Sequence, residues 1–96
     1  MTHPTVDHER LHLRGSFFMQ RNGERVALMT YAVAGARLII DHTEVDSSLR
    51  GTGAGHELVR AAVAWARDHD VRLTPVCPFA RAVFDKTPEF SDVRAD

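Results

Sequence analysis

Alternating apolar and polar residues in the first half of the chain predict three consecutive β-strands. The first begins near Arg10 and ends at Asn22-Gly23, a pair typical of a type I′ hairpin turn because both residues must take positive φ. The second strand covers residues 25–34 and the third covers residues 37–45, and both are rich in β-branched and large apolar side chains. A second short turn is predicted at Ala34-Gly35. Because short turns join antiparallel neighbours, these strands should form a meander.

Beyond this region the apolar period changes from strand-like to helix-like. The pattern predicts an amphipathic helix over residues 53–69, a buried strand over 71–76 and a short helix over 79–86. A strand–helix–strand unit joins roughly parallel strands through a right-handed crossover, and Pro75 and Pro78 restrict the last strand to a short or edge position. The predicted fold class is therefore α/β, with antiparallel strands, one crossover helix, one roughly parallel strand and a short C-terminal helix. The helix stripe comprises Gly55, Leu58, Val59, Ala62, Val63 and Ala66.

Length and composition indicate one small globular domain. The chain has 96 residues, of which 44% are hydrophobic and 26% are charged, and a chain of this size holds a single core. We expect the domain to span residues 10–96, and we expect residues 1–9, which carry no periodicity, to be a flexible N-terminus. His3, His8 and His12 are spaced too irregularly to indicate a metal site, so solvated side chains and no bound metal are expected.

Charge and cysteine content exclude several functional classes. The formal net charge is -1, from 12 basic and 13 acidic residues, which argues against a nucleic-acid partner because phosphate-backbone binding needs a basic surplus. No apolar run is long enough to span a membrane, and no signal-peptide pattern is present. Cys77 is the only cysteine and cannot form an internal disulfide, which favours a cytoplasmic protein.

The segment between the third strand and the long helix carries the strongest chemical signal. Gly51, Gly53 and Gly55 alternate there, next to Arg50. The first N–H groups of a helix have no partner within the helix and lie at the positive end of its dipole, so a glycine-rich entry suits an anion such as a phosphate. The alternative to an anion-binding loop is that these glycines only form the turn between the strand and the helix. A dinucleotide-binding loop is a poor match, since Glu57 stands where its third glycine belongs, and no Gly-Lys-Ser/Thr follows as a Walker A loop requires.

The sequence resembles the GCN5-related N-acetyltransferases. Arg50-x-x-Gly53-x-Gly55 matches their Arg/Gln-x-x-Gly-x-Gly/Ala signature, which follows a strand and opens a long helix. Three further stretches resemble the minimal, YjdJ-like members of roughly one hundred residues: His-Thr-Glu-Val at 42–45, Pro-Val-Cys-Pro-Phe at 75–79 and Pro-Glu-Phe at 88–90. The resemblance covers about residues 14–93.

This resemblance implies that the chain binds acetyl-CoA and transfers its acetyl group to an amine. The backbone of residues 38–45 would pair with the pantetheine arm like an added strand. The N–H of Val45 would lie near the thioester carbonyl, where it could stabilise an oxyanion. The pyrophosphate would be held by the amides of Arg50, Gly51, Thr52, Gly53, Ala54 and Gly55.

Two residues on the third strand are candidates for proton transfer. His42 and Glu44 lie two positions apart, so their side chains share one face of the strand. Amide formation needs a base for the amine proton, and either group could accept it through water. The alternatives are structural hydrogen bonds for both residues.

Cys77 is the third catalytic candidate. By resemblance, it stands where larger acetyltransferases place an asparagine, three residues before the small residue Ala80. Phe84 stands where they often place a tyrosine that serves as general acid, and a phenylalanine has no proton to give. Cys77 could donate that proton or be transiently acylated, or it could simply pack as a small apolar side chain.

The acceptor is the part of the reaction that the sequence does not identify. Larger relatives begin with a strand and two helices that shape the amine site, and the residues before Arg10 leave no room for them. The favoured hypothesis is that the protein is an N-acetyltransferase that acts on an exposed amine of a small molecule, a peptide or a protein lysine. The alternatives are a non-catalytic CoA-binding module or sensor, and a phosphate-binding fold unrelated to CoA. The sequence does not decide between a monomer and a dimer.

Overall fold

The computed structural model describes residues 4–95, and its sheet has five strands in the order β1-β2-β3-β4-β5. All neighbouring strands are antiparallel except β4 and β5, which are parallel. The parallel pair and the helix between its strands confirm the predicted α/β class. The strands are β1 (Asp7–Leu11), β2 (Arg14–Arg21), β3 (Glu24–Ala34), β4 (Arg37–Val45) and β5 (Arg72–Pro75).

Two α-helices and two short 3-10 helices complete the part of the chain that the structure describes. The helix α1 (Ala54–His69) occupies almost the predicted range, and α2 (Pro78–Lys86) ends before Thr87 as predicted. The 3-10 helices η1 (Ser47–Leu49) and η2 (Pro88–Val93) lie in segments for which no helix was predicted. Within residues 4–95, no helix is both long and apolar enough to cross a membrane.

The antiparallel part of the sheet has one strand more than the sequence predicted. The turn at Asn22-Gly23 has φ values of 55° and 79°, as a type I′ turn requires. The next turn lies at residues 35–36, one position later than predicted. The stretch beginning near Arg10 was wrongly taken as one strand. It is divided by a turn at His12, whose φ is 56°, and β1 already begins at Asp7.

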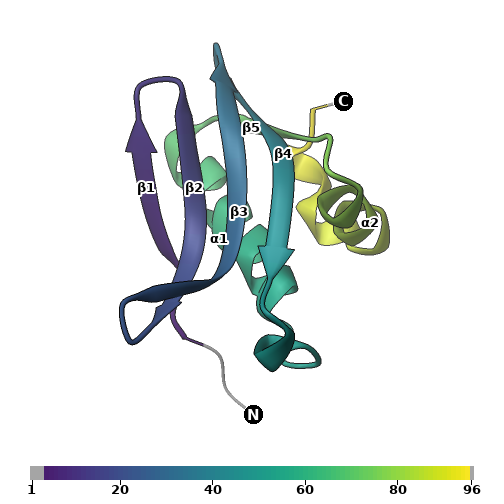
Figure 1. The fold of residues 1–96 in the computed structure, drawn as a ribbon. Helices are drawn as coiled ribbons and strands as arrows, with labels where there is room; N and C mark the ends of the chain where they lie inside the picture. The colour runs from purple at the N-terminus through teal and green to yellow at the C-terminus, as the bar shows by residue number, and fades with distance from the viewer. Residues whose placement is uncertain (1–3, 96) are drawn as a thin grey trace.

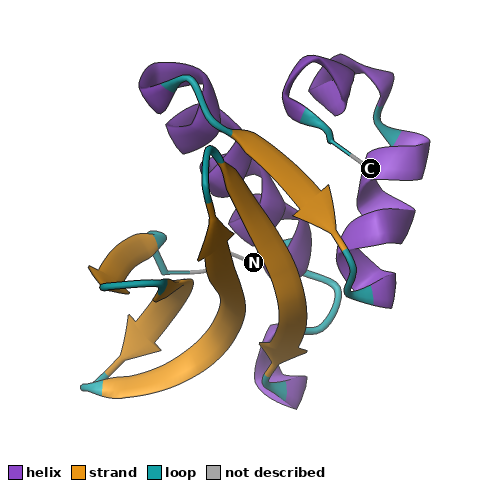
Figure 2. Cartoon of the chain, turned by 90° about the horizontal axis from the view of Figure 1, so that it is seen from above, coloured by secondary structure: helices purple, strands orange, loops and turns teal. Residues whose placement is uncertain are grey.

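Both α-helices pack on the same face of the sheet. In Figure 1 the antiparallel strands lie in front of α1, and Figure 2 shows the helices gathered on one side of the strands. Alternate residues of β2 and β3, among them Phe17, Met19 and Met29, join the apolar stripe of α1 in the core. Their neighbours point to the opposite face, which carries no helix among the described residues. We call this opposite face the uncovered face.

His8 is part of the packing that holds β1 on the sheet, which corrects the expectation that it is solvated. Its Nε2 lies 2.5 Å from the Tyr31 hydroxyl. Its ring stacks on Phe17 with centroids 4.1 Å apart and meets the edge of Trp65 at 5.1 Å. The sequence pattern missed this role because it placed the first strand too late. His3 and the rest of residues 1–3 lie outside the described residues.

Candidate functional site

The site forms where β4 and β5 separate. The two strands pair from Arg37 with Arg72 to Ile40 with Pro75. At that point the Ile40 carbonyl accepts hydrogen bonds from the N–H groups of both Val76, at 3.0 Å, and Cys77, at 2.9 Å. Residues 41–45 of β4 have no partner on β5. A gap therefore opens along the second half of β4.

A bulge in β4 turns its polar groups toward this gap. The β3–β4 register skips Asp41, passing from Thr30 with His42 to Tyr31 with Ile40. Beyond the bulge the Asp46 N–H donates to the Val26 carbonyl at 2.8 Å. Residues of an antiparallel ladder alternate in whether their polar groups face the partner strand. The N–H and C=O of Val45, and those of Thr43 before it, therefore point away from β3 into the gap.

The connection between β4 and α1 is tightly organised before its glycines. Asp46 caps η1, because its carboxylate accepts from the Ser48 N–H at 2.9 Å and from the Ser48 hydroxyl at 2.5 Å. These hydrogen bonds lower the pKa of Asp46 from its ordinary value. The Arg50 N–H donates to the Ser47 carbonyl at 3.2 Å, and the Thr52 N–H donates to the Leu49 carbonyl at 3.2 Å. The amides of Arg50 and Thr52 are thus used inside the loop.

Other N–H groups of the loop have no acceptor among residues 4–95. The first hydrogen bond of α1 runs from the Glu57 N–H to the Gly53 carbonyl, at 3.0 Å, so the first turn of the helix leaves its donors free. The residues that carry these donors line one concave region at the positive end of the helix dipole, which suits an anion. The free donors are the N–H groups of Gly51, Gly53, Ala54, Gly55 and His56.

Gly53 makes this arrangement possible. It is the N-cap of α1 with a φ of 81°, a left-handed conformation that costs about 1–2 kcal/mol for a residue with a side chain. A Cβ at Gly53 would meet no protein atom within 4 Å. The absence of a side chain here therefore does not serve packing within the described chain. The left-handed φ is what requires glycine at this position, and the space in front of its backbone is open.

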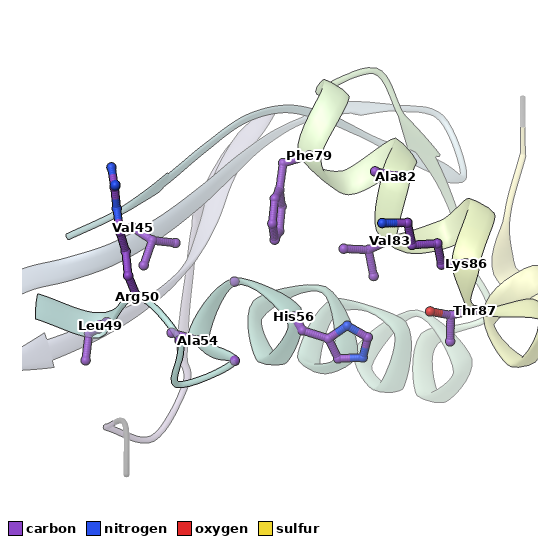
Figure 3. Close-up of a pocket in the computed structure, with 13 residues that line it drawn as sticks. Val45, Leu49, Arg50, Ala54, His56, Phe79, Ala82, Val83, Lys86 and Thr87 are labelled. Carbon is purple, nitrogen blue, oxygen red and sulfur yellow. The ribbon is translucent and has the colours of Figure 1, made fainter. Parts of the chain in front are cut away.

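The free amides face a cavity of about 670 Å³, a size typical of small-molecule sites. Figure 3 shows it between the first half of α1 and the side of α2, with Val45 and Arg50 at one end and Lys86 and Thr87 at the other. Of the predicted cofactor-binding residues, all but Thr52 line it. The lining residues are Val45, Leu49, Arg50, Gly51, Gly53, Ala54, Gly55, His56, Phe79, Ala82, Val83, Lys86 and Thr87.

Sequence reasoning missed the half of the cavity that α2 provides. Phe79 is 41% exposed although its ring lies against Gly55, where a Cβ would come within 2.5 Å of the ring. Gly55 is thus needed for close contact between the helices as well as for its free N–H. Phe79 belongs to a stretch quoted for the family resemblance, which could have identified it. No local signal in the sequence pointed to His56, Lys86 or Thr87 as lining residues.

His42 and Glu44 share one face of β4, as predicted. His42 Nε2 lies 3.2 Å from Glu44 Oε1, and both side chains are exposed. A hollow of about 480 Å³ lies beside Glu44 and is also lined by Val45 and Asp46. Val45 therefore contacts two concave regions, the main cavity and this hollow. The arrangement offers a carboxylate and an imidazole next to the exposed backbone of β4.

Cys77 lies at the point where β4 and β5 diverge. It is the N-cap of α2 and is 6% exposed. Its Sγ lies 3.4 Å from the Thr43 hydroxyl, and it does not line the cavity itself. The structure thus brings Cys77 to the open half of β4, beside Thr43, but separates it from His42 and Glu44. Within the described part of the chain, no cluster of three or more metal-ligating side chains occurs.

The fold and the loop define a known class of acetyl-transferring proteins. Residues 16–93 match the family described as GCN5-related N-acetyltransferase, and the chain belongs to this family. The predicted family is confirmed, whereas the minimal YjdJ-like subfamily stays a prediction.

Known proteins resemble this chain in sequence or in fold. Protein NATD1 of Bos taurus is 29% identical over 85 residues, which cover 86% of this chain and 74% of that protein. The solution structure of a GCN5-like protein from Staphylococcus aureus has a TM-score of 0.73 at 27% identity, covering 99% of this chain and 91% of the other. The aminoglycoside N-acetyltransferase AAC(6')-Iy, solved in complex with CoA, shares the fold with a TM-score of 0.56 at 14% identity, over 79% of this chain and 67% of its own.

Proposed function

We propose that this protein transfers the acetyl group of acetyl-CoA to a primary amine. The observation that carries the proposal is the set of free N–H groups at the start of α1, which face a cavity beside the unpaired half of β4. Family membership supports the same reaction. The pyrophosphate of acetyl-CoA binds the free amides of residues 51 and 53–56, and Arg50 adds a cation that can contact phosphate in a bidentate manner.

The gap beside β4 receives the pantetheine arm. The N–H and C=O groups of Thr43 and Val45 point into the gap and can pair with the amides of the arm as a neighbouring strand would. A thioester at the end of the arm then lies beside Val45. Its N–H stabilises the negative oxygen that forms when an amine attacks the carbonyl carbon.

The amine arrives through the hollow beside Glu44. The hollow is lined by the carboxylates of Glu44 and Asp46 and by Arg25, whose guanidinium is paired with Glu9. The remaining negative charge favours a cationic, protonated amine as the incoming group. The amine must lose a proton to attack, and Glu44 with His42 accepts it directly or through water. When the intermediate collapses, the C–S bond breaks and the CoA thiolate leaves. The Cys77 thiol, at the base of the gap, supplies a proton to that thiolate. The attacking nitrogen loses its second proton as the amide forms, and the Cys77 thiolate takes up that proton through water, which restores the thiol.

The experiment is an acetyl-transfer assay paired with a binding measurement. Calorimetry with acetyl-CoA, CoA and ATP should show heat of binding for the first two only. Labelled acetyl-CoA incubated with a panel of polyamines, lysine peptides and aminoglycosides should label at least one amine. Binding of CoA without transfer to any amine would favour a non-catalytic module, and binding of ATP without CoA would contradict the proposal.

A further inference from the structure

The cavity has a second polar end that the proposed acetyl-CoA contacts described above leave unused. Its middle is apolar, lined by Phe79, Ala82 and Val83. Lys86, His56 and Thr87 line its far end, and Figure 3 shows these three side chains grouped away from Val45 and Arg50. A ligand that fills the whole cavity would therefore meet cationic or hydrogen-bonding groups at both ends.

Lys86 carries the charge at this end. It is the last residue of α2, and its side chain extends back along the helix, so that its ammonium group lies toward Val83 and above the cavity (Figure 3). Among residues 4–95, no carboxylate forms an ion pair with Lys86. The ammonium is free to bind an anion.

His56 faces the same end with a donor available. Its Nε2 lies 3.3 Å from an Arg60 guanidinium nitrogen. A guanidinium can only donate, so Nε2 accepts and the ring proton is on Nδ1. That N–H has no acceptor within the described residues. Thr87 adds a hydroxyl that can donate or accept.

We propose that Lys86, assisted by His56 and Thr87, binds the 3′-phosphate on the ribose of CoA and makes the site selective for CoA over dephospho-CoA. This inference rests on the proposed function, which places the pyrophosphate at the other end of the cavity. The ribose separates the 3′-phosphate of CoA from the pyrophosphate, and an ammonium with no ion pair among the described residues, beside two further hydrogen-bonding side chains, provides charge and hydrogen bonds for this second anion. The pyrophosphate amides alone cannot distinguish the two ligands, because both ligands contain a pyrophosphate.

The test is a two-by-two comparison of ligand and variant, measured by calorimetry on the full chain. The wild-type protein should bind CoA about tenfold more tightly than dephospho-CoA, the effect expected of one charge-assisted contact. Lys86→Gln should lower the affinity for CoA to that for dephospho-CoA and leave the affinity for dephospho-CoA unchanged. Lys86→Arg should retain most of the preference. Thermal unfolding of each variant shows that it is folded.

Arg81→Gln is the matched control, because Arg81 is an exposed cation of the same helix that does not line the cavity. It should leave both affinities unchanged. Equal binding of the two ligands by the wild type, or an equal loss for both ligands in Lys86→Gln, would overturn the inference while leaving the proposed function in place. If neither ligand bound to the wild type, the proposed function would fail together with it.

Discussion

At the edge formed by β4 and β5, called the β4 end below, the chain leaves loop amides without partners beside a cavity, whereas at the β1 end the half-buried His8 side chain has a partner within the fold. The amides of Gly53, Ala54 and Gly55 have no acceptor among the described residues, and β4 loses its neighbour beyond Ile40. At the other end, His8 bonds the Tyr31 hydroxyl and is enclosed by aromatic rings. The β4 end therefore has N–H groups that can bind a ligand in the cavity, whereas the polar group of His8 at the β1 end is bonded within the protein.

This contrast separates residues that serve a ligand from residues that serve the fold. Gly51 and Gly53 are exposed, so water can bond the free N–H groups of the loop until an anionic ligand replaces it. Changes at the β4 end should therefore alter binding and turnover more than stability. Changes at the β1 end should alter stability and leave the affinity for CoA unchanged.

Gly53→Val should produce the largest effect on binding. A valine side chain would stand in front of the free amides and strain the backbone, so contacts to the pyrophosphate should be lost. Loss of two charge-assisted hydrogen bonds at about 2 kcal/mol each corresponds to about 1000-fold in affinity. Calorimetry with CoA measures this directly.

Gly23→Val is the matched control for backbone strain. Gly23 has a φ of 79°, and a Cβ there would also meet nothing within 4 Å, but it lies in the β2–β3 turn. Both variants should lose about 1–2 kcal/mol of stability, whereas only Gly53→Val should lose CoA. If both lost CoA equally, the loop would act through stability rather than as the binding site.

The second-largest effect is expected on kcat, when Glu44, the proposed base on the uncovered face, is replaced. Glu44→Gln should lower kcat about 100-fold, the lower range for loss of a general base, with little change in KM for acetyl-CoA. Steady-state kinetics with the amine that the panel identifies provides the measurement. Glu24→Gln is the control, because Glu24 is an exposed carboxylate at the start of β3 that lines neither concave region. An unchanged kcat in Glu44→Gln would remove Glu44 from the mechanism.

A smaller effect on kcat is expected for substitutions of Cys77, a residue that is both packed in the core and close to the gap beside β4. Its thiol is buried beside Thr43, yet it lies at the base of the gap. A thiolate is a good leaving group that needs little assistance, so Cys77→Ala should lower kcat about tenfold, and Cys77→Ser should recover part of the loss. Mass spectrometry after incubation with acetyl-CoA tests the acylated form. A Cys77→Ala protein with full activity would show that the cysteine only packs.

The helix and the glycine-rich loop at the β4 end were predicted from the sequence more accurately than the strands at the β1 end, because the signals for them are local. The spacing of Gly51, Gly53 and Gly55 before an amphipathic stripe is a local signal, because helix entry depends on neighbouring residues. The use of the Arg50 and Thr52 amides within the loop was not predictable, since it depends on how the loop turns. The turn at His12 was missed because a non-glycine residue with positive φ is uncommon and carries no clear pattern.

Long-range contacts account for the remaining misses. Lys86 and His56 are brought to one cavity by the packing of α2 beside α1, and the hydrophobic period of one helix does not state where another helix will lie. The His8–Tyr31 contact joins strands that are not adjacent in the sheet. An isolated histidine gives no sign of such a partner.

The smallest predicted effect tests the β1 end through pH. Burial lowers the pKa of His8, and the nearby charges of Arg10 and His69 lower it further. Below about pH 6.5, the ordinary value for histidine, the unfolded chain binds a proton at this position more readily than the folded protein does. Stability contributed by neutral His8 is therefore complete above that pH and is lost as the pH falls.

The measurement is the Tm at pH 7.5 and at pH 5.5. The wild type should lose a few degrees over this range, and His8→Gln, which has no proton to take up, should start lower at pH 7.5 and lose less. Carboxyl groups titrate about two pH units lower, so they contribute little here. The affinity of His8→Gln for CoA should match that of the wild type. A His8→Gln protein that is as stable as the wild type but binds CoA more weakly would show that the β1 end serves the ligand and would break the division between the two ends.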